Sequence, residues 1–293
     1  MSAAVDLPRT NRHSSWSVTS PRIKPAKIIA RLVLLLIVIA FVAPMLWLLL
    51  GSVHRDSALS VEFGGQYTLD NFRAVMNEQT LWLPLRNSLI LSGSTTIVTV
   101  VFASLAAYPL SRYQLRFRKM FLYTIVFSTG LPITAIMVPV YSMFAHFNIT
   151  DSIPATVLFM SATSMPFAIW MMKNFMDAVP VSLEEAAWTD GAGWLQALRH
   201  IVLPLMAPGV AVVSIFVFVT QWGDFFIPFI LLLSPDKQPA SVGIYTFFSQ
   251  YGAIAYGQLA AFSILYTLPI VFLYGVLSKY LGGAFNFAGG LKG

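Results

Sequence analysis

The sequence has no cysteine among its 293 residues, which excludes disulfide bonds, thiolate metal ligands and thiol catalysis. Charged residues are also scarce, at 10% of the chain, compared with about 25% in an ordinary soluble domain. Hydrophobic residues make up 57%, and the mean hydropathy is +0.73. Because so apolar a chain must be surrounded by lipid over much of its length, we expect an all-α, polytopic helical membrane protein.

No arrangement of residues typical of an enzyme's catalytic site is present either. The four histidines fall in separate predicted loops, so they indicate neither a metal site nor a base beside a nucleophile. No Gly-x-x-x-x-Gly-Lys-Ser/Thr phosphate loop occurs. We therefore expect no enzyme activity, no catalytic residue, no metal and no cofactor bound by this chain. Any ATP with its magnesium would be held by another polypeptide.

The net charge of +6 could suggest a nucleic-acid partner. The basic residues, however, collect at the edges of apolar runs, where the positive-inside rule places them in membrane proteins. We expect the lipid bilayer, and no nucleic acid, to be the surroundings of this chain.

Six apolar runs are long enough to cross a bilayer, which takes about 20 residues. They follow a basic tail, residues 1–31, that we expect to be disordered, so that residues 32–293 form the transmembrane domain. Five prolines are expected to interrupt the spans: Pro132, Pro139, Pro166, Pro228 and Pro269. The spans are predicted at about 32–53, 88–110, 120–144, 154–173, 205–233 and 257–281.

The distribution of basic residues predicts the orientation. Most Lys and Arg residues lie in the tail, after the second span, around residues 180–204 and at the C-terminus. On the other side of the membrane, the predicted loops contain only four basic residues, Arg55, Arg73, Arg86 and Lys237. Both termini and the 180–204 loop are therefore predicted to lie in the cytosol.

The 180–204 loop is polar and flanked by apolar runs on both sides. Ser182 and Glu185 have the spacing of a capping box, which predicts a short helix beginning there. Gly191 and Gly193 supply backbone freedom for a bend, and a second short helix leads to Pro204. We expect two helices along the membrane surface that contact a partner protein.

The loop resembles a known motif. A Glu-Ala-Ala sequence, a glycine and an Ile-x-Leu-Pro sequence follow one another at the spacing of the cytosolic EAA motif of permease subunits in bacterial ABC importers. The segments 87–89, 106–112 and 166–170 also look like sugar-importer permeases, in particular the shorter, six-span subunit of the maltose-transporter type. The motif residues are Glu185, Ala186, Ala187, Gly191, Ile201, Leu203 and Pro204.

This resemblance implies one half of a heterodimeric pore in the bacterial cell (inner) membrane. The implied partners are a sibling permease, two ATP-binding subunits in the cytosol and a solute-binding protein outside. The motif residues would couple the pore to the ATPase. Glu185 would either pair with a basic residue of that partner or fix the loop internally.

Asp224 is the outstanding charged residue inside a predicted span, where a carboxylate is costly unless it faces water or a partner. One interpretation is that it lines the translocation path together with Gln221 and Trp222, with Tyr141 as a further candidate. The other is that Asp224 caps a helix break or pairs across a subunit interface. The family usually has Asn where Gly223 stands, which puts a direct polar role at that position in doubt.

Other function classes stay open at this point. The solute could be a di- or oligosaccharide, or it could be a glycerophosphodiester, an amino acid, a phosphate or a peptide. A secondary carrier usually has more spans and inverted halves, and no internal repeat is visible here. A channel or structural subunit would not need a docking loop.

Overall fold

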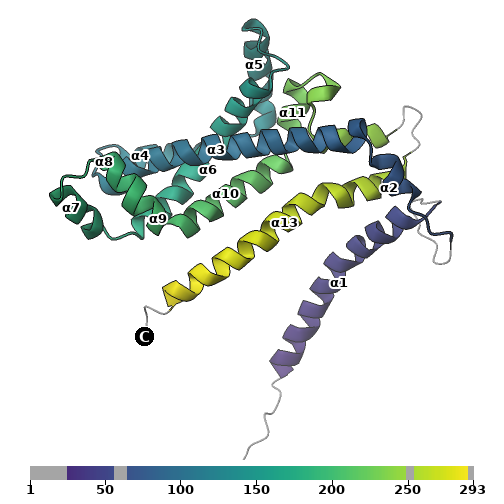
Figure 1. The fold of residues 1–293 in the computed structure, drawn as a ribbon, viewed down its shortest axis with the longest axis horizontal. Helices are drawn as coiled ribbons and strands as arrows, with labels where there is room; N and C mark the ends of the chain where they lie inside the picture. Colours follow the sequence, from purple (N-terminus) through teal and green to yellow (C-terminus); the bar gives the residue numbers. More distant parts are fainter. Residues whose placement is uncertain (1–24, 56–64, 249–253, 290–293) are drawn as a thin grey trace, which may run out of the picture. The chain divides into compact units, whose positions relative to one another are not determined.

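The computed structural model describes residues 25–55, 65–248 and 254–289 and consists of two units, residues 1–47 and 48–293 (Figure 1). Most of the predicted basic tail, residues 1–24, lies outside the described residues. Helix α1 runs Pro25–Val53. Proline suits a first helical turn because its ring fixes φ near the helical value. The helix thus already includes residues 25–31 of the predicted tail.

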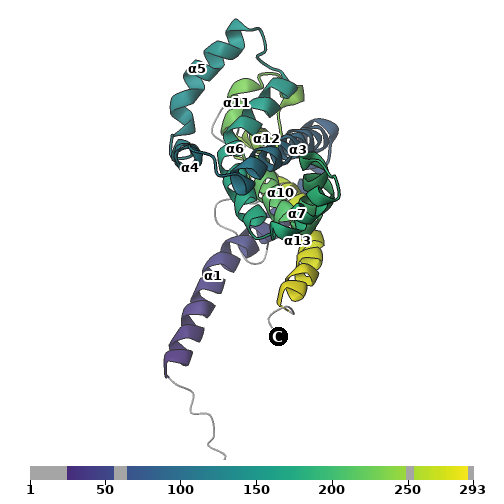
Figure 2. The ribbon, with the colours of Figure 1, turned by 90° about the vertical axis from the view of Figure 1, so that its left-hand side faces the viewer.

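Three long helices form the centre of the second unit: α3 (Leu83–Arg112), α6 (Ile153–Asp177) and α10 (Ala207–Trp222). Their buried contact includes Ala103, Met172 and Val213, all of which are fully inaccessible to solvent. Gly209 permits the close approach of α10 to α6, because a Cβ at that position would lie 2.4 Å from Cγ of Phe175. Figure 2 shows this packing from the end at which α7 lies.

The other elements of the second unit are shorter, except for α13, and the described residues contain no strand, only two isolated bridges. They are α2 (Asp70–Val75), a π-helical turn (Glu78–Trp82), α4 (Arg118–Ser128), α5 (Ile133–His146), α7 (Ser182–Thr189), α8 (Trp194–Ala197), a second π-helical turn (Leu198–Val202), α9 (Leu203–Leu205), α11 (Phe226–Leu231), a 3₁₀ turn (Pro235–Lys237), α12 (Ala240–Gly243), a second 3₁₀ turn (Ile244–Phe247) and α13 (Tyr256–Gly289).

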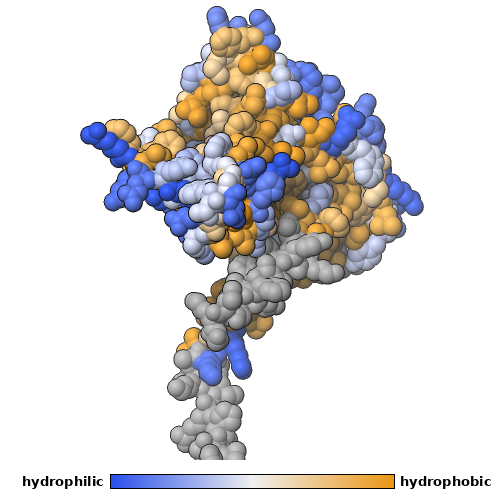
Figure 3. All heavy atoms as spheres, turned by 60° about the vertical axis from the view of Figure 1, so that its left-hand side comes forward, coloured by the Kyte–Doolittle hydropathy of each residue, from blue (hydrophilic) through white to orange (hydrophobic). Residues whose placement is uncertain are grey.

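Four helical segments in the described residues are long and apolar enough to cross a membrane: Ile29–Val53, Glu78–Arg112, Ile153–Asp177 and Tyr256–Val276. Up to six result if each of two bent helix pairs is one span. Apolar residues cover much of the face seen in Figure 3, as expected for a surface in contact with lipid or with other membrane subunits.

The third predicted span, 120–144, is not one straight helix. It divides into α4 and α5, whose axes differ by 92° across a break of a few residues. Pro132 explains the break, because it lacks an amide hydrogen and disfavours helical geometry at Leu131. By contrast, Pro139, Pro166 and Pro269 lie inside helices that continue past them, so the expectation that they interrupt the spans is wrong.

The fifth predicted span, 205–233, is also divided. The segment Trp194–Leu205 meets α10 at 81°, and α10 ends at Trp222, before residues 223–225 and the short α11. This second break brings Asp224 out of regular helix.

Polar contacts fasten the 233–240 segment to the N-terminal ends of α3 and α6. The Asn87 side chain donates to the carbonyls of Asp236 and Gln238, at 2.8 and 3.1 Å. The Lys237 ammonium lies 2.7 Å from the Asp151 carboxylate and, together with bonds from Ser234, holds the pKa of Asp151 well below its usual range. This end of the molecule is the opposite end of α6 from the 180–204 loop.

Candidate functional site

Helix α7 carries the Glu-Ala-Ala sequence at the start of what we call the EAA loop, residues 180–204. Its first turn differs from the sequence prediction, because Ser182 lies inside the helix and makes no capping hydrogen bond. The amide of Glu185 instead donates to the carbonyl of Val181 at 3.1 Å. The start of α8, by contrast, is capped by a side chain: the amide oxygen of Gln196 accepts from the backbone amide of Gly193 at 2.9 Å.

The turn between α7 and α8 depends on Gly191. Its φ is +87°, a left-handed value that side chains disfavour, whereas Gly193 has an ordinary φ of −76°. The space around Gly191 is open, so its requirement is conformational and not steric. Of the two glycines expected to permit a bend, only Gly191 adopts a conformation that requires glycine.

Glu184, the residue before the motif, fixes α7 to the core of the second unit. Its side chain is completely buried, and one carboxylate oxygen accepts from the Tyr108 hydroxyl at 2.9 Å. The other accepts from Nε of Arg112, whose side chain is only 2% exposed. Because each buried ionic group satisfies the other, α7 is tied to the last turn of α3.

The same guanidinium reaches the end of α6. It donates to the carbonyl of Met176 at 3.1 Å and to that of Val179 at 3.2 Å. Carbonyls at and just after a helix C-terminus have acceptor capacity that the helix does not use, and Arg112 occupies it at both residues. One side chain therefore joins α3, α6 and α7.

A second polar cluster lies at the edge of this junction. Ser111 donates to the Asp177 carboxylate at 2.6 Å, and the Lys173 ammonium bonds the same carboxylate. These contacts add a link between the C-terminal ends of α3 and α6 that does not involve the EAA loop itself.

The EAA loop exposes one face and buries the other. Glu185, Ala186 and Pro204 are exposed, and Ala187, Ile201 and Leu203 are partly buried. Leu198 and Val202 on the other side pack into the core formed by α3, α6 and α10. The methyl-sized Ala186 can therefore be approached closely from outside, as a docking surface requires.

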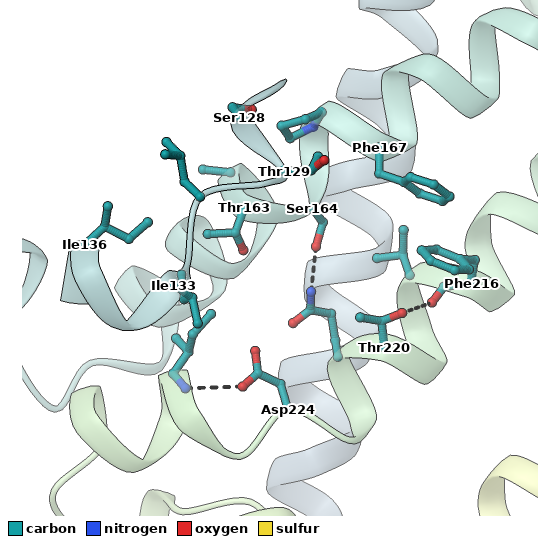
Figure 4. Close-up of a pocket in the computed structure, with 16 residues that line it drawn as sticks. Ser128, Thr129, Ile133, Ile136, Thr163, Ser164, Phe167, Phe216, Thr220 and Asp224 are labelled. Atoms are coloured by element: carbon teal, nitrogen blue, oxygen red, sulfur yellow. Dashed lines mark hydrogen bonds between the residues drawn. The ribbon is translucent and has the colours of Figure 1, made fainter. Parts of the chain in front are cut away.

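A separate cavity of about 570 Å³ lies beside the break at residues 223–225 (Figure 4). Its wall combines apolar side chains, such as Ile133 and Phe167, with the polar groups of Ser164, Gln221 and Asp224. The figure shows Ser164 on α6 and Asp224 at this wall, each with a hydrogen bond drawn as a dashed line, to the amide of Gln221 and to the backbone amide of Ile227 respectively. Both predicted polar residues of the fifth span thus line one space.

Asp224 has a structural role at this wall. Its carboxylate accepts from the amide of Ile227 at 3.2 Å, which satisfies a free amide at the start of α11. The capping interpretation is therefore correct for Asp224, and the side chain lines the cavity at the same time. A carboxylate has several acceptor positions, so a cap leaves capacity for another donor.

Gln221 is held by Ser164: the amide nitrogen of Gln221 donates to the Ser164 hydroxyl at 2.5 Å. Its amide oxygen is buried and has no hydrogen-bond partner. An unpaired buried carbonyl of this kind costs about 1–3 kcal/mol, so it favours a water or ligand donor. This is the kind of group that orients a polar solute.

The sequence pattern of a known family matches the part of the chain that includes both regions. The family is described as binding-protein-dependent transport system inner membrane component, and the match covers residues 99–285. The chain belongs to this family. It is a multi-pass membrane protein and a permease subunit of an ABC importer.

Individual relatives agree with this family. A putative ABC transporter permease of Streptomyces antibioticus is 34% identical over 212 residues, which cover 72% of this chain and 92% of that protein. The maltodextrin transport system permease MdxG of Bacillus subtilis is 32% identical over 242 residues, 82% of this chain and 86% of the relative. A solved bacterial ABC transporter for alginate import has the same fold, with a TM-score of 0.77 at 19% identity over 89% of this chain and 98% of that one.

Two of the four residues predicted for the translocation path do not line this cavity. Trp222 is buried, stacks on Tyr266 of α13 at 5.5 Å between ring centroids, and does not line the cavity. Tyr141 on α5 is 38% exposed and does not line it either. Of the four candidates, the cavity brings together Gln221 and Asp224.

Sequence reasoning missed the pairing of Glu184 with Arg112. The available signal was an arginine at the end of a span and a second glutamate before the motif. Nothing in the sequence pattern pairs two residues so far apart in the chain. In the described part of the chain, no group of three or more His, Asp or Glu residues could hold a metal ion.

Proposed function

We propose that this permease is one half of a heterodimeric pore that imports a sugar, a di- or oligosaccharide, and that its EAA loop docks on a separate ATPase. The observation that carries the proposal is the construction of that loop. Its inner face is fixed to α3 and α6 through Glu184 and Arg112, while Glu185 and Ala186 face outward. Force applied to a loop fixed in this way would move the ends of both helices.

A sugar is the solute class favoured by the relatives and by the cavity. Relatives bear the names of maltodextrin and sulfoquinovosyl glycerol permeases. Gln221 and Asp224 offer acceptors for hydroxyl groups beside apolar walls, and such a combination suits polyhydroxylated ligands. A non-sugar solute is the second candidate, because other ABC importers share the loop.

The proposed assembly contains a sibling permease, two ATP-binding subunits and a solute-binding protein outside the cell membrane. This chain would bind no cofactor, and ATP with magnesium would be held by the ATPase. The excess of Lys and Arg at the EAA-loop end supports cytosolic termini. ATP-driven closure would move the loop only if the loop makes different contacts in the two states.

The first experiment is purification of the tagged chain in mild detergent, with mass spectrometry of the proteins that accompany it. We expect a sibling permease and an ATPase with the wild type, and loss of the ATPase alone with Glu185→Arg. Glu78→Arg, the same charge reversal at an exposed residue beside the N-terminal end of α3, is the matched control. A chain that purifies alone and moves solute without ATP would overturn the proposal.

The solute is then tested with the complete complex in proteoliposomes. Maltodextrins, disaccharides, glycerophosphodiesters and amino acids are offered with the co-purified binding protein, and ATP hydrolysis is measured. Stimulation by a saccharide supports the sugar proposal. Stimulation only by an amino acid or phosphodiester replaces it with the second candidate.

A further inference from the structure

The turn between α3 and α4 forms a second cavity, of about 520 Å³, which shares no lining residue with the cavity at Asp224 or with the EAA loop. Its walls are apolar side chains of α3, the turn and α4, together with two guanidinium groups; no carboxylate lines it. The apolar lining residues are Ala106, Pro109, Leu110, Leu115, Phe117 and Phe121, and the basic ones are Arg116 and Arg118. We call this cavity the α3–α4 groove.

The apolar part of the groove is open to its surroundings. Leu115, Phe117 and Phe121 are 46%, 65% and 44% exposed. At the end of a membrane span, exposed apolar groups around a hollow are a surface that lipid acyl chains cover. The groove therefore accepts an apolar group from outside the chain.

The charged part of the groove can receive an anion. Arg116 lies 5.7 Å from the ring of Phe117, and neither it nor Arg118 forms an ion pair with a described residue, although the charge of Arg118 also acts on the carboxylate of Asp177. Two carboxylates of the same helix ends are already bonded, Asp177 to Lys173 and Glu184 to Arg112. With Lys119 beside them, the arginines form a local excess of positive charge.

The groove has its apolar walls and its two arginines at the same depth in the membrane. The span that contains α3 ends at Arg112, and α4 begins at Arg118, so the groove lies where apolar helix surface gives way to charged residues. At that depth a phospholipid presents its phosphate above its acyl chains. Basic pockets between membrane helices bind anionic lipid headgroups, and guanidinium matches phosphate geometry.

We propose that the α3–α4 groove binds an anionic phospholipid, with the phosphate at Arg116 and Arg118 and one acyl chain between Pro109 and Phe121. Binding would fasten the end of α3, which also carries Arg112 and hence the EAA loop. The inference depends on the chain being a membrane protein and not on which solute it transports.

The test uses the purified complete complex, delipidated in detergent and titrated with phosphatidylglycerol or phosphatidylcholine while bound lipid is counted by native mass spectrometry. We expect phosphatidylglycerol to bind and phosphatidylcholine to bind at least tenfold more weakly. Arg116→Gln combined with Arg118→Gln should lower the affinity for phosphatidylglycerol about 30-fold, because two basic contacts are lost. Arg55→Gln with Arg73→Gln removes the same charge from exposed positions elsewhere and should change nothing.

A second pair of variants tests the apolar half. Leu115→Trp fills the groove from an exposed position and leaves the charges, and Phe121→Glu places a carboxylate at an exposed wall. Both should lower phosphatidylglycerol binding at unchanged melting temperature. The proposal is overturned if both variants bind normally, if phosphatidylcholine binds equally well, or if inorganic phosphate displaces the lipid. Loss of the ATPase from the arginine variant at normal lipid binding would identify a protein interface instead.

Discussion

The EAA loop and the break at residues 223–225 each place a carboxylate beside packed apolar helices, but the two carboxylates have different hydrogen-bond partners. Glu184 is fully buried and bonded by Tyr108 and Arg112, so its acceptors are occupied by fixed side chains. Asp224 is bonded to a backbone amide and borders a cavity. The first arrangement makes a rigid junction of three helices, and the second leaves acceptors facing a space that a solute could enter.

The largest expected effect comes from removing Glu184. Glu184→Ala leaves Arg112 buried without its anion, and breaking a buried pair in this way costs about 3–5 kcal/mol. Thermal unfolding of the purified complex and proteolysis of the EAA loop measure the change. Glu185→Ala, on the exposed neighbour, should stay within about 0.5 kcal/mol of wild type.

The pair can also be replaced as a unit. Glu184→Met combined with Arg112→Met removes both charges and should recover part of the stability lost with Glu184→Ala. If Glu184→Ala and Glu185→Ala have equal effects, the junction is not the fixed element described above.

The next effect concerns Gly191. Gly191→Val forces a β-branched residue into a left-handed conformation, which costs about 1–3 kcal/mol, while Gly191→Asn should cost less because Asn tolerates this region. Uptake is expected to be lost with Val and retained in part with Asn, at normal membrane insertion. Gly193→Ala is the matched control, since its Cβ would meet only Gln196, at 4.0 Å. Normal uptake by a well-inserted Gly191→Val protein would contradict the conformational requirement.

A smaller effect is expected at the break. Asp224→Ala loses the bond to Ile227, at a cost of about 1 kcal/mol, whereas Asp224→Asn keeps an acceptor and should leave the melting temperature unchanged. If Asp224 also contacts the solute through its charge, Asp224→Asn lowers uptake at normal stability. Equal uptake by Asn and wild type, with loss in Ala, would reduce Asp224 to a structural cap.

The smallest effect is expected for the Asp151–Lys237 pair at the far end of α6. The pKa of Asp151 is lowered on folding, so its contribution is complete above the unfolded pKa of about 3.9 and is lost as pH falls through the folded value. Asp151→Asn should lower stability by at most about 1 kcal/mol, because the pair is partly exposed. The difference from wild type should be constant from about pH 8 to pH 5 and shrink only below about pH 4. A difference that already shrinks near pH 6 would exclude this assignment.

The sequence by itself determined the helical membrane class, the place of the EAA loop and the bend that its glycines permit; that only Gly191 needs to be glycine came from its φ in the structure. Hydrophobic run length, the spacing of the motif residues and the conformational freedom of glycine are local properties, and they can be read from neighbouring residues. The capping of a helix break by Asp224 could be stated as an alternative for the same reason.

Only the tertiary structure decided which distant side chains meet. It paired Glu184 with Arg112, turned Trp222 toward Tyr266 and away from the cavity, and placed Gly209 against Phe175. It also showed that Pro132 breaks a span while Pro139, Pro166 and Pro269 do not. Such outcomes depend on the packing of helices far apart in the chain, and the sequence pattern of one segment carries no record of which neighbour will satisfy its polar groups or fill the space beside it.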